Sequence, residues 1–139
     1  MLDTLASHGY ARVTPPLAEY EDGLTERMQG GSRSDLIRLV DPISQRTLAL
    51  RPDMTMQIGR IAATSMADRP RPLRLSYSGQ VLKLRSGQLQ PERSRLQIGA
   101  ELIGTDSVVA ASEIVSVAIE ALERAGVSGI TVDFTMPDL

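Results

Sequence analysis

The sequence predicts an α+β fold in which a largely antiparallel sheet is flanked by helices. Apolar residues recur at helical spacing in two long segments, near residues 54–67 and 107–125. Between and before them lie paired apolar runs joined by turn-rich stretches, which is typical of β-hairpins. The chain has 139 residues and suits a single domain with one core. Only one Phe, three Tyr and no Trp are present, so aliphatic side chains must fill that core.

The first part of the chain predicts a helix end, a strand and a loop. Residues 1–8 have the pattern of the last turns of a helix, which Gly9 closes in a left-handed cap. Such an abrupt start leads us to expect a fragment, or a chain that starts later than its relatives. Residues 10–14 then predict a short strand that ends at Pro15-Pro16, because proline cannot donate to a sheet. Glycine and serine in residues 28–34 predict a mobile loop.

The middle of the chain predicts a hairpin followed by a helix. Residues 35–40 and 47–50 are apolar-rich, and the segment 41–46 between them has turn chemistry. The helix over 54–67 ends before the prolines of residues 69–72. Its inward positions at helical spacing are predicted to be Ile58, Ile61, Ala62 and Ser65.

The last part of the chain predicts a second, longer hairpin, a helix and a final strand. Residues 73–85 and 94–103 read as strands around a turn-rich loop at 86–93. The helix over 107–125 is capped by Gly126, and residues 130–134 read as a last strand. The inward face of this helix is predicted to contain Val108, Ala111, Val115, Ala118 and Leu122.

Composition excludes several classes of function. Cysteine is absent and His8 is the only histidine, which argues against disulfides, zinc sites and histidine-dependent triads. The net charge is −2, the estimated pI is 5.4, and the Lys and Arg residues are scattered, which argues against a nucleic-acid partner. No apolar run of 18 residues occurs, so we expect no membrane span and a cytoplasmic protein. We expect no metal and no cofactor.

The strand near residues 95–102 has a polar face. Alternation places one set of side chains toward the predicted core: Leu96, Ile98, Ala100 and Leu102. The opposite face carries Arg95, Gln97, Gly99 and Glu101. A glycine between an amide and a carboxylate leaves room for a ligand to approach the backbone. An ordinary solvent-facing strand would have the same pattern.

The preceding strand carries cations on the matching face. Gly79, Lys83 and Arg85 alternate with Leu82 and Leu84, which are predicted to face the core. If the two strands pair, the cations share one side of the sheet with the carboxylate of the next strand. That arrangement complements a zwitterion, whose ammonium would meet the carboxylate and whose carboxylate would meet the lysine. Simple cross-strand ion pairing is the alternative.

The segment Arg51-Pro52-Asp53-Met54-Thr55 lies where a strand ends and a helix begins. Asp53 has the residue type and position of a helix N-cap, which is the default explanation. Because Pro52 fixes the backbone, Asp53 and Thr55 could also project from a rigid corner toward a ligand amine.

These segments together resemble the class II aminoacyl-tRNA synthetases, specifically the histidyl branch. Gly9 to Glu19 resembles motif 1, residues 50–55 resemble the branch's Leu-Arg-Pro-Glu-Gly-Thr segment, and residues 73–104 resemble motif 2 with the strand that follows it. The resemblance implies a partial class II catalytic-core domain over residues 1–139 that lacks the motif 3 half. It also implies a dimer interface that includes Pro16 and Glu19. A histidine site would be formed by Asp53, Thr55, Lys83, Gln97 and Glu101.

Two departures from the synthetase pattern change the expected function. Lys83 and Arg85 stand where motif 2 has the arginine and glutamate that bind the α-phosphate and adenine of ATP. A lysine lacks the bidentate guanidinium fork, and an arginine reverses the charge of the glutamate. This combination resembles the regulatory subunits of short-form ATP phosphoribosyltransferases, as do the segments 91–104 and 132–137.

That resemblance implies a protein with no catalytic residue of its own. It would bind a catalytic ATP phosphoribosyltransferase subunit in a hetero-oligomer, would self-associate through the motif 1 region, and would convey feedback inhibition by L-histidine in histidine biosynthesis. The alternatives are a divergent or truncated histidyl-tRNA synthetase and a synthetase-like amino-acid ligase. The residues at positions 83 and 85 argue against both.

Overall fold

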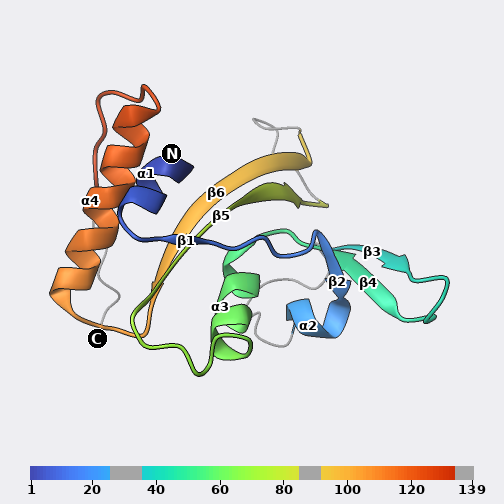
Figure 1. Cartoon of the computed structure of the whole chain (residues 1–139). Coiled ribbons are helices and arrows are strands. Elements are labelled where there is room, and N and C mark those ends of the chain that lie inside the picture. The colour runs from blue at the N-terminus through green and yellow to red at the C-terminus, as the bar shows by residue number, and fades with distance from the viewer. Residues whose placement is uncertain (26–35, 85–91, 134–139) are drawn as a thin grey trace.

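The computed structural model describes residues 1–25, 36–84 and 92–133 and confirms an α+β architecture with small sheets and flanking helices (Figure 1). The loop predicted at 28–34, Arg85 and most of the turn at 86–93 lie outside the described residues. The elements, in chain order, are α1 (Leu2–Ser7), β1 (Ala11–Arg12), β2 (Ala18–Tyr20), α2 (Glu21–Thr25), β3 (Ile37–Val40), β4 (Thr47–Leu50), α3 (Thr55–Ala63), β5 (Leu73–Leu82), β6 (Ser94–Ile103) and α4 (Val108–Arg124).

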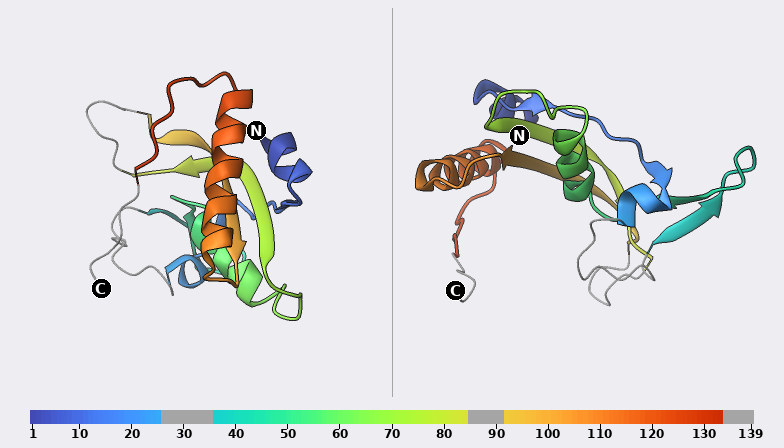
Figure 2. Two further views of the ribbon diagram at one scale, coloured as in Figure 1. Left: turned by 90° about the vertical axis from the view of Figure 1, so that its left-hand side faces the viewer. Right: turned by 90° about the horizontal axis from the view of Figure 1, so that it is seen from below.

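The larger sheet has the strand order β1-β5-β6. β5 and β6 form the predicted antiparallel hairpin, with a register that runs from Leu73 opposite Ile103 to Leu82 opposite Ser94. β1 pairs with β5 in parallel, and its short length follows from the two prolines after it. Helices α1 and α4 cover one face of this sheet and α3 lies on the other (Figures 1 and 2).

The second sheet has the order β2-β4-β3 and is antiparallel throughout. The predicted β3–β4 hairpin is confirmed, and it projects away from the larger sheet (Figure 1). Asp41 stabilises its turn, because the Asp41 carboxylate accepts hydrogen bonds from the backbone of Ile43 and from the backbone and hydroxyl of Ser44. Strand β2 and helix α2 were not predicted, since both are too short to show a period.

The position of the core differs from the prediction. The largest buried cluster lies on the sheet face that also carries Gln97 and Glu101, and it comprises Met54, Ile58, Ala62, Leu75, Tyr77 and Val81. Leu96, which was predicted to face the core, is 62% exposed. The prediction was wrong because the apolar side chains on this face come from β5 and α3, whereas the pattern was read from β6 alone.

Both long helices depart from their predicted limits or faces. Helix α3 ends at Ala63 rather than 67, and Ser65 lies beyond it in an exposed turn. On α4 the buried positions are Val117 and Ala121, whereas Val108 is 82% exposed. The buried stripe of α4 is rotated around the helix axis relative to the predicted one, because α1 and Ala100 of β6 pack against a different side of the helix from the side that the sequence predicted. Residues 130–133 form no strand, so the prediction of a final strand is wrong for the part described.

A buried guanidinium connects the two sheets. The Arg51 side chain is only 5% exposed and donates to the backbone oxygens of Gln80 (2.8 Å), Pro15 (2.7 Å) and Pro16 (3.3 Å). Its own backbone bonds to Leu17 and Leu82. Burial lowers the pKa of Arg51, and the charge of nearby Glu19 opposes this effect. Arg51 therefore ties the segment before β2 to the end of β4 and to β5.

We expect Arg51→Met to lower the free energy of unfolding by about 3 kcal/mol or more, because it removes the side-chain hydrogen bonds to the Pro15 and Gln80 oxygens. Urea denaturation measures the change. Arg124→Met is the matched control, since the Arg124 side chain is 62% exposed and forms an i,i+4 pair with Glu120. Its expected cost is about 0.5 kcal/mol or less. A loss below about 1 kcal/mol in Arg51→Met would contradict the assigned role.

Candidate functional site

The polar residues of the β4–α3 corner lie at the surface of the core cluster. Met54 occupies the N-cap position of α3, so Asp53 is not the N-cap residue that the sequence predicted. The Met54 side chain is fully buried. The Asp53 Oδ1 atom nevertheless accepts a hydrogen bond from the backbone N–H of Thr55 at 2.7 Å. This local bond holds the carboxylate against the start of the helix.

Gln97 connects this corner to β6. Its Nε2 atom donates to Asp53 Oδ2 at 2.7 Å, and its Oε1 atom accepts from the backbone N–H of Met54 at 3.0 Å. The second bond fixes which way the amide points, because a backbone N–H can only donate. Asp53 and Gln97 are thus held together although 44 residues separate them in sequence.

Tyr77 completes the cluster and was missed from the sequence. Its hydroxyl lies 3.1 Å from Thr55 Oγ1 and 3.0 Å from Glu101 Oε1, and the residue is only 3% exposed. The register pairs Tyr77 with Gly99, and a Cβ atom at Gly99 would lie 2.4 Å from the tyrosine oxygen. The gap at Gly99 is therefore filled by the tyrosine ring, not left open for a ligand. An aromatic residue opposite a glycine is the signal that the sequence offered.

Burial raises the pKa of the Tyr77 phenol to about 12, and the nearby negative charges of Glu101 and Asp53 contribute in the same direction. The hydrogen bond with Thr55 acts in the opposite direction. The phenol is consequently protonated at neutral pH and can donate a hydrogen bond.

Lys83 does not join this cluster. It is exposed and lies just past the end of β5, where its backbone N–H donates to the Arg93 oxygen at 2.9 Å. The register pairs Gly79 with Gln97 and Leu75 with Glu101. Lys83 is therefore roughly 13 Å along the strand from the level of Gln97 and roughly 26 Å from that of Glu101. The structure brings together Asp53, Thr55, Gln97 and Glu101, with Tyr77 between them.

The two residues predicted for a dimer interface make contacts within the chain. The Pro16 oxygen accepts hydrogen bonds from Arg51 Nη1 and from Gln57 Nε2. Glu19 forms an ion pair with Arg60 of α3. These contacts attach the segment before and within β2 to the helix that follows the polar corner.

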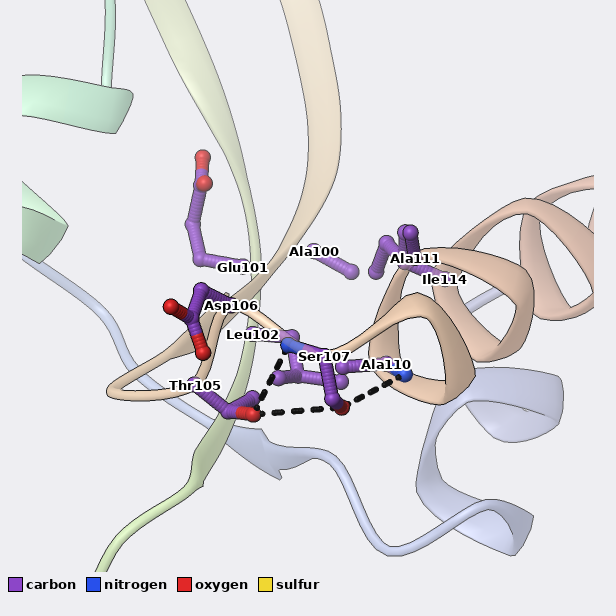
Figure 3. Close-up of a pocket in the computed structure, with 9 residues that line it drawn as sticks. All are labelled: Ala100, Glu101, Leu102, Thr105, Asp106, Ser107, Ala110, Ala111 and Ile114. Atoms are coloured by element: carbon purple, nitrogen blue, oxygen red, sulfur yellow. Dashed lines mark hydrogen bonds between the residues drawn. The ribbon is translucent and has the colours of Figure 1, made fainter.

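Two hollows lie outside the centre of the polar cluster, and Glu101 of the cluster is a lining residue of the first. One, of about 320 Å³, lies between β6 and the start of α4, and the Glu101 side chain points away from the α4 residues that line it (Figure 3). The Ser107 side chain caps α4 there by accepting from the Ala110 backbone. The other, of about 560 Å³, lies beside Glu19 and Arg60. Neither hollow contains the Asp53–Gln97 pair.

The described residues hold no group of three or more His, Asp or Glu side chains that could bind a metal ion. Within residues 1–25, 36–84 and 92–133, no helix has the length and apolar character that crossing a membrane requires.

Comparison with known proteins gives the same family over the whole chain. The family profile described as histidyl-tRNA synthetase matches residues 1–139. A relative from Paramagnetospirillum magneticum named ATP phosphoribosyltransferase regulatory subunit is 48% identical over 100% of this chain and 37% of its own length. A relative of the same name from Rhodospirillum centenum is also 48% identical, over 100% of this chain and 36% of its own length. The chain therefore spans about a third of the length of these curated relatives.

Solved structures agree with this assignment. One from Bacillus halodurans, described as an ATP phosphoribosyltransferase regulatory subunit/histidyl-tRNA synthetase, has a TM-score of 0.77 and 35% identity over 92% of this chain and 32% of its own. A pyrrolysyl-tRNA synthetase from Desulfitobacterium hafniense has a TM-score of 0.76 at 18% identity, over 91% of this chain and 43% of its own. At this low identity, the similarity to the pyrrolysyl-tRNA synthetase shows a shared fold alone.

The raised pKa values of two buried tyrosines predict how the stability of the fold changes at high pH. Burial raises the pKa values of Tyr10 and Tyr77 from 10.0 to about 12. Because the folded-state pKa is the higher one, this contribution to stability is complete below pH 10 and is lost as the pH rises toward 12. We expect the free energy of unfolding to fall across this window. Urea denaturation at several pH values should show a smaller fall in Tyr77→Phe, and an unchanged fall would contradict the assignment.

Proposed function

The chain belongs to the histidyl-tRNA synthetase family, and from this membership we propose that it is part of a regulatory subunit of ATP phosphoribosyltransferase that binds histidine without activating it. The observation that carries the proposal is the contrast between the two ends of the β5–β6 hairpin. At one end Asp53, Thr55, Gln97 and Glu101 are held in a connected hydrogen-bond network. At the other end an exposed lysine occupies the motif 2 position.

The polar cluster suits the ammonium group of an amino acid. Asp53 and Glu101 supply carboxylate oxygens, and Thr55 supplies a hydroxyl oxygen, all within one connected network. A protonated amine can donate three hydrogen bonds and has no lone pair with which to accept one, so acceptor oxygens are the groups that recognise it. Gln97 and Tyr77 hold these acceptors in place through β5 and β6.

Lys83 is poorly suited to the activation of an amino acid with ATP. Activation requires charge stabilisation aimed at the transferring phosphate. A lysine ammonium is a single point charge on a flexible stem and cannot form the paired bonds of an arginine fork. Retention of the amino-acid site without this group supports a sensing role in which histidine changes the balance between two states of an assembly.

The proposed partner is a catalytic ATP phosphoribosyltransferase subunit, in line with the names of the relatives from Paramagnetospirillum magneticum and Rhodospirillum centenum. Self-association through the region of Pro16 and Glu19 is part of the same proposal. Lys83, which the family resemblance placed in the histidine site, is left out of the proposed site, because it lies roughly 13 Å along the strand from the level of Gln97 and a histidine held by the cluster would not reach it.

The alternative is a divergent or truncated histidyl-tRNA synthetase. One observation favours it: a solved structure from Alicyclobacillus acidocaldarius described as a histidine–tRNA ligase subunit is 34% identical to this chain, with a TM-score of 0.74 over 91% of this chain and 35% of its own. The two functions differ in whether histidine is activated with ATP.

Histidine-dependent exchange of pyrophosphate into ATP separates the two functions. We expect no exchange above background, because the residue at position 83 cannot replace an arginine fork. A histidyl-tRNA synthetase assayed in parallel is the positive control. Clear exchange by the protein as the cell makes it would support the synthetase and contradict the proposal.

The histidine site predicts two losses of affinity. Asp53→Asn and Glu101→Gln should each weaken histidine binding by about 1–3 kcal/mol, the range for loss of a hydrogen bond to a charged group. Isothermal titration calorimetry of the protein as the cell makes it gives the affinities. The exposed residues Asp68 and Glu123 provide matched controls, as Asp68→Asn and Glu123→Gln, which should leave binding unchanged. Equal affinities in all four variants would refute the site.

A further inference from the structure

The smaller sheet, β2-β4-β3, has one face that is packed and one face that is open. Ala49 lies in the central strand β4 and is fully buried, because Leu24 and Leu36 pack against it in a separate core cluster. Side chains alternate between the two faces of a strand, so Leu48 and Leu50, on either side of Ala49, point to the opposite face. Both are only partly buried. The packed face of this sheet is therefore the Ala49 face.

The opposite face is apolar across all three strands. Residues that are paired across antiparallel strands share a face, so the register gives two apolar rows that each cross the sheet. We call this set the open face, and it comprises Ala18, Tyr20, Ile37, Leu39, Leu48 and Leu50. None of the six is buried, and the side chains of Tyr20 and Leu39 are exposed. An exposed apolar patch that continues over neighbouring strands is typical of a surface that binds another protein.

A cation and an anion lie at one corner of the open face. Arg46 precedes β4, and its guanidinium carbon is 3.7 Å from the centroid of the Tyr20 ring. The Arg46 side chain is exposed and lies 3.8 Å from the carboxylate of Asp22, which is more exposed still. Arginine and tyrosine are enriched in protein interfaces and among the residues that contribute most to binding. This corner therefore presents an aromatic ring and both signs of charge to a partner.

The open face is also hollowed beside β2. Three of its residues, Ala18, Tyr20 and Leu48, line the hollow of about 560 Å³ that extends to Glu19 and Arg60. A hollow with an apolar part can receive an apolar side chain of a partner, as the pockets of protein interfaces do. The β3–β4 hairpin, which carries most of the open face, projects away from the larger sheet (Figure 1). The face thus has the relief of a docking surface as well as its composition.

The contacts next to the open face favour a second copy of the chain as the partner. The family resemblance assigns self-association to the segment that contains Pro16 and Glu19, but both residues are bound within the chain, the latter to Arg60. Glu19 is paired with Ala49 and so lies on the packed face. Tyr20, the next residue of the same strand, points the other way. Self-association through β2 is therefore available on the open face.

We propose that the open face is a self-association surface, on which two copies of the chain pack sheet against sheet about a two-fold axis. Such an axis is the commonest symmetry of soluble oligomers and requires a patch that is complementary to itself. An apolar face meets this requirement, and the Asp22 carboxylate of one copy supplies a partner for the Arg46 guanidinium of the other. This inference rests on the self-association that is part of the proposed function, and it moves the contact from Pro16 and Glu19 to the open face.

Sedimentation velocity over a dilution series, on the protein as the cell makes it, measures the dissociation constant of the dimer. Leu39→Lys places a charge on the open face and should raise this constant by about tenfold or more. Val40→Lys is the matched control, because Val40 is the next residue of β3 and points to the Ala49 face. It should change the constant by less than about twofold. Val40 is 61% exposed and Leu39 is 41% exposed, so exposure alone would predict the opposite order of effects.

The outcomes separate this inference from the proposed function. A dimer that Leu39→Lys leaves intact would overturn the inference and leave the proposed self-association in place. An unmodified protein that stays monomeric at every concentration would overturn both. If Leu39→Lys keeps the dimer but no longer binds the catalytic subunit, the inference is wrong, because the open face then belongs to that partner. It is also wrong if Leu39→Lys, unlike Val40→Lys, loses cooperative urea unfolding, because the face is then buried within the protein's own chain.

Discussion

The buried guanidinium of Arg51 is the contact on which the rest of the structure depends. One side chain donates to carbonyl oxygens of Gln80, Pro15 and Pro16, which belong to segments far apart in the chain. Desolvating a charge is costly unless its hydrogen bonds are satisfied, and these carbonyls satisfy them. Because Arg51 directly precedes the polar corner, the same contacts that join the two sheets also fix where Asp53 and Thr55 begin α3.

Two glycines on the β5–β6 hairpin make this arrangement possible. A Cβ atom at Gly79 would lie 2.3 Å from Arg51 Nη2, and one at Gly99 would lie 2.4 Å from the Tyr77 oxygen. The missing side chain at each glycine therefore leaves room for a long side chain from another segment, which is Arg51 at Gly79 and Tyr77 at Gly99. The polar cluster is preorganised by these internal contacts, so its acceptor oxygens are already held in position.

A preorganised site without an activating arginine suits a sensor better than a catalyst. Catalysis needs groups aimed at charge that develops in the transition state, whereas a sensor needs only a ligand that binds one state more tightly than another. Under the proposed function, the amino-acid end of the hairpin is retained while its nucleotide end changes.

The sequence by itself determined the α+β class, both hairpins and the residues of the polar corner, because turn chemistry and alternation are local properties. The cluster of Asp53, Gln97 and Glu101 could be predicted as one site only through the family resemblance. The tertiary structure decided which sheet face holds the core, why Gly99 is a glycine, and that Tyr77 joins Thr55 to Glu101. These features depend on which helix packs on which face, and a pattern read along one strand contains no information about its neighbours across the sheet.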